Sequence, residues 1–351
     1  MMNILVTGGA GFIGSHTCLI LLESGFNITI LDSLVNSSNA SLKRLSKIVS
    51  NNFYTNNINL INGDIRDLLI VRDIFINERK KDKPIEAVIH FAGLKSVGES
   101  NKFPLKYWDS NVRGIINLLN VMKENNCKKI VFSSSATIYG KTKSGIISEN
   151  SSIDPINPYG QTKAAIEKIL IDISKSDPEW RIANLRYFNP AGAHTSGIIG
   201  EDPLKTPNNI FPIINLVASG RLKEFTIFGG DWPTPDGTCI RDYIHVMDLA
   251  ESHLYALRYL FNKGINVLNV NIGTGKGTTI LELIKTFEHV NNVKINYKYG
   301  ARREGDAPIT IANNSLAKST LNFNPKRSVE DMCKDSWNWT CKNPNGYILT
   351  T

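Results

Sequence analysis

Close to its start the chain reads Ile4-Leu5-Val6-Thr7-Gly8-Gly9-Ala10-Gly11-Phe12-Ile13-Gly14. An apolar run, a glycine-rich turn and a helical pattern follow one another here, which predicts a strand, a tight turn and a helix. The glycines fit both G-x-x-G-x-x-G and G-x-G-x-x-G. Glycine lets the backbone approach a pyrophosphate, whose charge is met by amide groups at the helix N-terminus. The stretch therefore predicts a dinucleotide-binding turn that opens a βαβ unit.

An acidic residue, Asp32, ends the next predicted strand, residues 28–31. At this place a carboxylate accepts hydrogen bonds from the adenine ribose and repels a 2′-phosphate. Ser33 and Leu34 follow and offer no arginine for such a phosphate, so the sequence favours NAD over NADP. After a later strand, Gly63-Asp64-Ile65 either holds the adenine or forms an ordinary turn.

Short apolar runs alternate with helical patterns through the first half of the chain. Uniformly apolar strands that alternate with helices predict a Rossmann-like, doubly wound parallel sheet covered on both faces, an α/β fold. The expected strands are residues 4–6, 28–31, 58–61, 87–91, 129–133 and 182–185, and the expected helices are residues 15–24, 67–78, 106–125 and 159–174.

The composition of the sequence changes after Asn189, where loops rich in Gly, Pro and Asn are predicted. Further helices are expected at residues 211–219, 246–260 and 280–290. We expect an NAD-binding domain over residues 1–188, with a returning segment near 239–275. Residues 189–351 are expected to form a smaller α/β substrate lobe over the carboxyl edge of the sheet.

Composition narrows the class of protein. The 351 residues are 42% hydrophobic and 21% charged, as in globular proteins. The net charge of +8 is spread along the chain, so we expect no nucleic-acid partner. Five scattered cysteines without C-x-x-C argue against disulfides or a metal site and favour a reducing cytoplasm. The sequence shows no signal peptide and no apolar run near the roughly 20 residues that span a bilayer, so we expect no membrane association.

A possible proton-transfer pair lies in Pro158-Tyr159-Gly160-Gln161-Thr162-Lys163. Residues four apart share a helix face. A lysine ammonium and a nicotinamide cation nearby would stabilise a tyrosine phenolate, which can take a hydroxyl proton as hydride leaves for nicotinamide. An ordinary surface pair would look the same, and only the glycine turn upstream favours catalysis.

Three serines, Ser133-Ser134-Ser135, end an expected strand at the edge of the sheet where such folds bind ligands. One of the three hydroxyls could bridge the substrate and Tyr159. Their spacing does not select which, and a serine run at a strand end is also common turn chemistry.

Over essentially its whole length the chain resembles the extended short-chain dehydrogenase/reductase superfamily and, within it, the UDP-glucose 4-epimerases. The strings that carry the resemblance are Val6-Thr7-Gly8-Gly9, His90-Phe91-Ala92-Gly93-Leu94-Lys95, the segment 133–140, Arg186-Tyr187-Phe188-Asn189-Pro190, Arg241-Asp242-Tyr243-Ile244-His245-Val246 and Arg302-Arg303-Glu304-Gly305-Asp306.

The resemblance implies an isomerase that keeps NAD bound and interconverts UDP-galactose and UDP-glucose. Transient oxidation at C4 of the UDP-hexose would be followed by return of hydride to the opposite face. It also implies that Ser135 is the proton relay, Tyr159 the base and Lys163 its electrostatic partner. A homodimer formed through the helices near 106–125 and 159–174 is implied as well.

Binding residues follow from the same resemblance. The implied cofactor contacts are Gly8, Gly11, Phe12, Ile13, Gly14, Asp32, Asn36, Asp64, Ile65, Phe91, Ala92, Gly93, Lys95, Asn111, Tyr159, Lys163 and Phe188. The implied substrate contacts are Lys95, Ser135, Tyr159, Asn189, Asn209, Thr226, Phe228, Arg241, Arg303, Asp306 and Thr310. Arginines suit a diphosphate because their planar forks bind its oxygens bidentately. Structural roles are expected for Tyr187, Asp242 and His245.

Thr310 departs from part of the family. It corresponds to a site near the sugar C2 substituent, where a bulky tyrosine tends to exclude N-acetyl sugars. We expect threonine to leave room for UDP-GlcNAc and UDP-GalNAc.

Other activities remain as alternatives. A nucleotide-sugar 4,6-dehydratase needs an acidic pair after the relay hydroxyl, where this chain has Ala136 and Thr137. A decarboxylase, a pentose 4-epimerase and a non-catalytic NAD sensor stay open, although such sensors commonly lose the Tyr/Lys pair.

Overall fold

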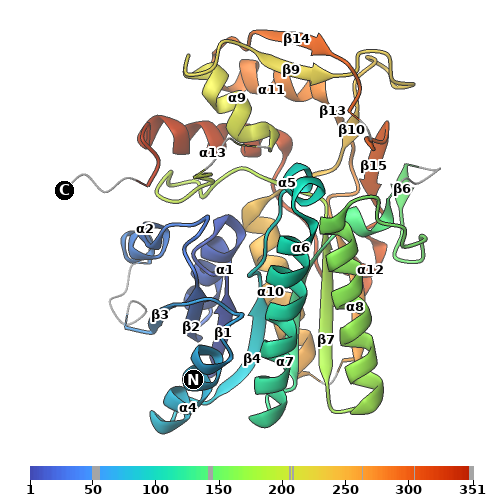
Figure 1. Cartoon of the computed structure of the whole chain (residues 1–351). Coiled ribbons are helices and arrows are strands. Elements are labelled where there is room, and N and C mark those ends of the chain that lie inside the picture. The colour runs from blue at the N-terminus through green and yellow to red at the C-terminus, as the bar shows by residue number, and fades with distance from the viewer. Residues whose placement is uncertain are drawn as a thin grey trace.

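The computed structural model describes residues 1–49, 56–140, 145–204, 207, 209–262, 264–303 and 305–347. Glu304, in the motif that contains Arg303, lies outside this part of the chain. One large sheet with helices on both sides forms the lower part of the molecule in Figure 1, and a smaller lobe lies above the sheet.

Seven parallel strands make the large sheet, in the order β12-β7-β5-β4-β1-β2-β3. They are β1 (Asn3–Thr7), β2 (Asn27–Asp32), β3 (Ile58–Asn62), β4 (Ile85–His90), β5 (Lys129–Ser135), β7 (Arg181–Tyr187) and β12 (Val267–Ile272). The chain winds outward from β1 to β3 and then restarts on the other side of β1 at β4. The predicted doubly wound sheet is therefore confirmed, and its topological switch point lies between β1 and β4.

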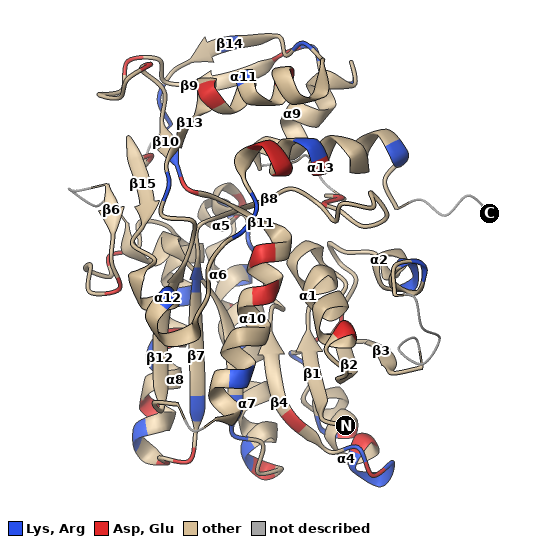
Figure 2. Cartoon of the chain, turned by 180° about the vertical axis from the view of Figure 1, so that it is seen from behind, with Lys and Arg blue, Asp and Glu red and all other residues tan. Residues whose placement is uncertain are grey.

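Helices cover both faces of this sheet. One face carries α1 (Phe12–Glu23), α2 (Asn39–Lys43), α10 (Val246–Phe261) and α12 (Ser315–Leu321), and the other carries α4 (Leu68–Lys80), α7 (Gly114–Glu124) and α8 (Pro158–Ser176) (Figures 1 and 2). Successive strand residues alternate between the two cores, because side chains alternate along a strand. Ile4 and Val6 lie in the first core and Leu5 in the second.

The upper lobe has its own core, around Phe211, Ile214, Ile227, Leu283 and Phe287. Its elements are α9 (Ile210–Ala218), β9 (Phe225–Phe228), α11 (Ile280–Asn291), β14 (Tyr297–Gly300) and α13 (Val329–Lys342). Two small sheets join it to the large one: β8 (Asn189–Ala191) with β11 (Tyr243–His245), and the four strands β13 (Thr278–Thr279), β10 (Ile240–Arg241), β15 (Ile309–Ala312) and β6 (Ile146–Ile147). The lobe lies over the carboxyl ends of the main strands (Figure 1).

Two sequence predictions differ from the structure. The strand β12 was not predicted, although it lies inside the segment expected to return to the first domain. The helix expected over residues 106–125 is present, because α6 (Pro104–Tyr107), a π-helical turn (Trp108–Arg113) and α7 follow one another without a break, but its middle is π-helical and not α-helical. A further short helix, α5 (Val97–Lys102), precedes it. Side-chain hydrogen bonds of Asn111, within that turn, compete with a regular helix.

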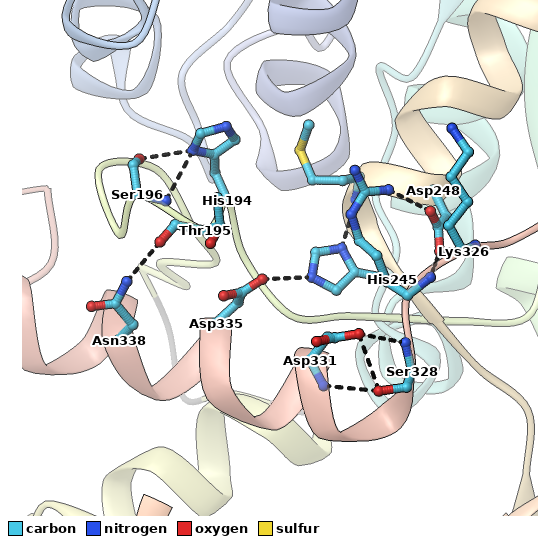
Figure 3. A network of polar contacts seen from close by, with 12 residues as sticks. His194, Thr195, Ser196, His245, Asp248, Lys326, Ser328, Asp331, Asp335 and Asn338 are labelled. Atoms are coloured by element: carbon cyan, nitrogen blue, oxygen red, sulfur yellow. Dashed lines mark hydrogen bonds and ion pairs between the residues drawn. The ribbon is translucent and has the colours of Figure 1, made fainter. Parts of the chain in front are cut away.

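Hydrogen bonds between polar side chains connect the start of α10 to α13 (Figure 3). His245 is fully buried, accepts from the amide of Met247 at Nδ1 (3.1 Å), and meets Asp335 Oδ2 at 3.2 Å through Nε2. Nε2 therefore carries the proton and donates it to Asp335. Arg327 pairs with Asp248. His245 thus has the structural place expected for it, at the junction of the two lobes.

Charges are scattered over the fold, with Lys and Arg interspersed among Asp and Glu (Figure 2). Of the helices in the described ranges, none has the length and apolar character needed to cross a bilayer.

Candidate active site

The predicted cofactor and catalytic residues lie along one edge of the main sheet. Gly8, Asp64, Phe91 and Phe188 come just after β1, β3, β4 and β7, while Asp32 and Ser135 end β2 and β5. Because the strands are parallel, their carboxyl ends meet at the same edge. Residues far apart in sequence thus gather beneath the upper lobe.

The dinucleotide turn requires glycine at two positions. Gly8 has a φ of 72°, and a Cβ there would lie 2.7 Å from the amide nitrogen of Ala92. A Cβ on Gly14 would lie 2.3 Å from the carbonyl oxygen of Gly8. Gly11 is the N-cap of α1 and has no side chain to cap it. A backbone cradle that any side chain would fill, at a helix N-terminus, fits a pyrophosphate. The amides of Phe12 and Ile13 belong to this helix start.

The carboxylate of Asp32 holds the turn together. Its Oδ2 accepts a hydrogen bond from the amide of Ala10 (2.9 Å), and Oδ1 accepts from the amide of Leu34 (2.9 Å) and from Ser37 Oγ (2.8 Å). Lone pairs remain for ribose hydroxyls. Asn36 is exposed, and in the described part of the chain no hydrogen bond or ion pair joins its side chain to another predicted site residue.

Asp64 is bound by Arg66 in the turn after β3. The Arg66 amide (2.8 Å) and Nε (3.0 Å) donate to Oδ1, and Nη2 donates to Oδ2 (2.6 Å). These bonds lower the pKa of Asp64, so it is an acceptor. The neighbouring Ile65 is buried. Asp64 therefore serves the turn, and its contact with adenine stays a prediction.

Asn111 holds the loop after β4. Its Oδ1 accepts from the amide of Leu94 (2.8 Å), and its Nδ2 donates to the Leu94 carbonyl (3.1 Å) and to Thr162 Oγ1 (3.1 Å). Gly93 packs against it, since a Cβ there would lie 3.0 Å from Asn111 Oδ1. Asn111 is only 2% exposed, so its evident task is to fix this loop.

The structure distinguishes the three serines of β5, and the first two are engaged elsewhere. The carbonyl oxygen of Ser133 accepts a hydrogen bond from Lys163 Nζ (2.6 Å). Burial raises the pKa of Tyr187, and its interaction with the Ser133 side chain partly offsets that rise. The hydroxyl of Ser134 lies 2.5 Å from Glu167 Oε1. Because a carboxylate only accepts, this serine donates its proton to Glu167.

Ser135 is the serine that faces the tyrosine. Its Oγ accepts from the amide (3.2 Å) and hydroxyl (3.0 Å) of Thr137. Burial raises the pKa of the Tyr159 phenol, and its interaction with Ser135 partly offsets that rise. This geometry favours Ser135 as the relay among the three candidates.

Tyr159 and Lys163 lie in the first two turns of α8, whose start is fixed by Asn157 capping the Gly160 amide (2.8 Å). Tyr159 is partly exposed as a residue, but its hydroxyl is buried, and burial raises its pKa to about 12. Burial lowers the pKa of Lys163 to about 7, against the charge of Glu167, which raises it. Lys163 Nζ lies 5.8 Å from the centre of the Tyr159 ring. Further positive charge here would favour the phenolate.

Two arginines meet at Asp306 in the upper lobe. Arg241 Nη2 lies 3.8 Å from Asp306 Oδ1, and Arg303 Nε donates to Asp306 Oδ2 (3.0 Å). The guanidinium of Arg303 lies 4.7 Å from the centre of the Phe228 ring. Thr226 is two residues before Phe228 on β9 and so lies on the same face of that strand. The structure therefore brings together two guanidinium groups and an aromatic ring, which suit a nucleoside diphosphate.

Thr310 is the direct neighbour of Arg241 across the parallel pair β10 and β15. Its carbonyl oxygen accepts from the amide of Asp242 (3.1 Å). Asp242 in turn accepts from Thr274 (2.8 Å at the amide) and Gly275 (2.9 Å), as a structural residue would. A small side chain thus stands beside the arginine group.

Sequence reasoning missed Glu201, which connects two of its own candidates. Glu201 Oε1 accepts from Asn209 Nδ2 (2.6 Å) and lies 3.4 Å from Lys95 Nζ. This links the loop after β4 to the start of α9. Asn189 donates to the Asp242 carbonyl (3.0 Å). No local motif marks Glu201, because its partners come from distant segments.

Comparison with known proteins identifies the family of the chain. The family model described as GDP-mannose 4,6 dehydratase matches residues 5–336. UDP-glucose 4-epimerase 4 of Oryza sativa subsp. japonica is 49% identical over 98% of this chain and 92% of its own length. The chain belongs to the UDP-glucose 4-epimerases, within that broader family.

Two further relatives of this epimerase family bear on the substrate. A bifunctional UDP-glucose 4-epimerase and UDP-xylose 4-epimerase 1 of Pisum sativum is 48% identical over 98% of this chain and 97% of its own length. The crystal structure of UDP-glucose 4-epimerase from Stenotrophomonas maltophila, with bound NAD and formylated UDP-arabinopyranose, is 42% identical. It covers 98% of this chain and 99% of its own, with a TM-score of 0.93.

Dehydratase chemistry, which the broader family is named after, does not fit this site. The residues that follow Ser135 are Ala136 and Thr137, where a dehydratase needs an acidic pair. The amide and the hydroxyl of Thr137 both donate to Ser135. The site of this epimerase family member therefore lacks the acid for water elimination at that position.

Proposed function

We propose that the protein is an NAD-dependent UDP-glucose 4-epimerase that interconverts UDP-galactose and UDP-glucose. The observation that carries the proposal is the grouping of Ser135, Tyr159 and Lys163 between the end of β5 and the start of α8, at the carboxyl edge of a dinucleotide fold. The epimerases that match along almost the whole chain support it.

The glycine turn and Asp32 would hold the pyrophosphate and the adenine ribose of NAD. When bound, NAD supplies a hydride acceptor at the nicotinamide and a positive charge near the phenol. The fit is supported by Gly8 and Gly14, where no side chain can be accommodated. Asp64, Phe91, Gly93 and the other residues implied by resemblance stay predicted contacts.

Tyr159 takes the proton of the sugar O4 hydroxyl by way of Ser135. The positive charge of protonated Lys163 stabilises the phenolate form of Tyr159. Burial lowers the pKa of Lys163 to about 7, so a part of the lysine carries this charge at neutral pH. The C4 centre becomes planar on oxidation and is rebuilt with inverted configuration after the hexose turns. The proton then returns from Tyr159 to O4.

Arg241 and Arg303 would bind the diphosphate, with Asp306 holding them in place until the ligand arrives. Phe228 and Thr226 would contact the nucleoside, and Lys95, Asn189 and Asn209 the remainder of the UDP-hexose. Anchoring at the diphosphate leaves the hexose free to turn, which inversion requires.

We also propose that N-acetyl sugars are accepted, because Thr310 is small and stands beside Arg241. Parallel assays of UDP-GalNAc and UDP-galactose test this. Absence of N-acetyl turnover beside fast UDP-galactose turnover would reject it.

A pentose substrate is the second candidate. The bifunctional relative from Pisum sativum, which includes UDP-xylose 4-epimerase in its name, motivates it. Incubation with UDP-xylose and separation of the product nucleotide sugars measures this activity directly.

A homodimer is proposed from an exposed apolar surface on α5–α7. Val97, Phe103, Leu105 and Ile116 are exposed there, Leu105 by 82%. A second copy would cover them. Light scattering of Leu105→Glu should show monomer, whereas Leu222→Glu, on an exposed site of the upper lobe, should remain dimeric.

We further propose a cytoplasmic location, because all five cysteines are free thiols.

The decisive experiment compares wild type with Tyr159→Phe. Wild type should convert UDP-galactose to UDP-glucose, detected with a UDP-glucose dehydrogenase. Tyr159→Phe should lose about 10²- to 10⁴-fold in kcat while still retaining NAD. Retained NAD with no turnover in wild type would favour the NAD sensor, and full activity of the variant would remove Tyr159 from the mechanism.

A further inference from the structure

A third residue, Glu167, continues the four-residue spacing of Tyr159 and Lys163 along α8. Tyr159, Lys163 and Glu167 are spaced four residues apart on α8 and so share one face. Lys163 and Glu167 make hydrogen bonds to Ser133 and Ser134 near the end of β5, and Tyr159 interacts with the next serine, Ser135. Helix and strand thus meet at three points, and only two of them belong to the mechanism described so far.

Glu167 is held rigidly at the third point. Arg186 donates to both of its oxygens, from Nε to Oε1 (3.0 Å) and from Nη2 to Oε2 (2.6 Å). Their side chains are only 2% and 3% exposed. Arg186 Nη1 donates further to the hydroxyl of Tyr139 (2.8 Å). A buried bidentate pair with additional partners has one strongly preferred geometry.

We propose that Glu167 is a positioning residue of the proton-transfer site, which acts by holding Ser134 and so fixing the end of β5. The inference rests on the proposed function and deepens it. Ser134 lies between the carbonyl that binds Lys163 and the hydroxyl that serves Tyr159. A displacement of Ser134 would therefore move both contacts, and misplacement by about 1 Å can cost on the order of 10²-fold in rate.

Glu167 also acts on Lys163 by its charge. Around Lys163 the charged or titratable groups are Glu167 and Tyr159 on α8, His90 on β4 and Arg186 on β7. Burial lowers the pKa of His90 to about 3, so this ring is neutral. The carboxylate of Glu167 raises the pKa of Lys163 and opposes the effect of burial. It favours the ammonium form at neutral pH.

Ser134→Ala tests whether the contact between Glu167 and Ser134 positions the end of β5. It removes the donor to Glu167 and keeps the Glu167–Arg186 pair. We expect kcat for UDP-galactose to fall about tenfold with KM and the pH profile unchanged.

Glu167→Gln tests the charge. Without the carboxylate Lys163 loses its proton at lower pH, so the alkaline limb of the kcat profile should move down by about one pH unit. Because Glu167→Gln leaves Arg186 unpaired in the core, the double variant Glu167→Gln/Arg186→Met provides a form without an isolated buried charge. Asp172→Asn removes an exposed acid from the same helix and is the matched control.

A purely structural role would give a different result. Folded Glu167 variants and Ser134→Ala would then show a lower Tm, but kcat and the alkaline limb would stay at wild-type values, and the proposal would be overturned. Inactive wild-type protein would instead refute the proposed epimerase activity, so the two failures can be told apart.

Discussion

Lys163 donates a hydrogen bond of 2.6 Å to the carbonyl oxygen of Ser133. This bond ties the second turn of α8 to the end of β5, and the lysine is 5% exposed. A buried ammonium is costly unless its environment compensates for the lost hydration. The site therefore keeps a poorly hydrated charge at the place where a phenolate is needed.

Lys163→Met should change activity and stability in opposite directions. We expect kcat to fall about 10²-fold or more, because the phenolate of Tyr159 loses its ammonium partner. Tm at pH 7 should be equal or higher, because an apolar side chain replaces a buried amine beside the Phe132 ring. Steady-state kinetics and thermal unfolding measure both. Lys168→Met, on the exposed side of α8, is the control and should affect neither.

Gly14→Ala should damage the dinucleotide turn. Its Cβ would lie 2.3 Å from the carbonyl oxygen of Gly8, so the backbone must shift, at a cost of about 1–3 kcal/mol in unfolding free energy. NAD retention should be lost as well. Urea unfolding and NAD content after purification measure the two effects. Gly98→Ala has no atom within 4 Å of its Cβ, and a similar loss there would contradict this explanation.

Thr310→Tyr should narrow the substrate range. The larger ring would occupy space beside Arg241 and reduce kcat/KM for UDP-GalNAc by about tenfold or more, equivalent to about 1.4 kcal/mol, with UDP-galactose little affected. Thr310→Ser, which keeps the site small, is the control. Equal losses for both sugars would show that residue 310 does not read the C2 substituent.

Acid should destabilise the fold through buried histidines. Burial lowers the pKa of His16, His90 and His253 from 6.5 to about 3. Between these values the unfolded chain binds more protons than the folded chain, so stability falls as pH falls from 6.5 towards 3.

Replacing one of these histidines measures how much it contributes to the pH dependence of the unfolding free energy. His253→Asn should reduce the slope of unfolding free energy against pH, near pH 5, by about 1.4 kcal/mol per pH unit. Urea titrations at several pH values give the slope. An unchanged slope would mean that His253 is already protonated in the folded protein.

The local parts of this structure were accessible from sequence because short-range physics sets them. Periodicity and the glycine turn predicted β1, α1 and β2 with their order, and parallel strands placed the candidate residues at one edge. The strand β12 was not recognised, because its place beside β7 is set by long-range pairing and not by any local pattern. The π-helical turn was not predicted for the same reason. It contains Asn111, whose side chain hydrogen-bonds Leu94 and Thr162, and both partners are distant in the sequence.

Sequence alone was enough for the fold class, the glycine cradle, Asp32, and the four-residue spacing of Tyr159 and Lys163, since each depends on neighbours along the chain. The folded chain was needed to show which serine faces the tyrosine, because Ser133 and Ser134 are engaged by Lys163 and Glu167 across the gap between strand and helix. The same holds for Glu201 between Lys95 and Asn209. Hydrogen bonds between distant segments depend on how the backbone is brought together, and no spacing in the chain encodes them.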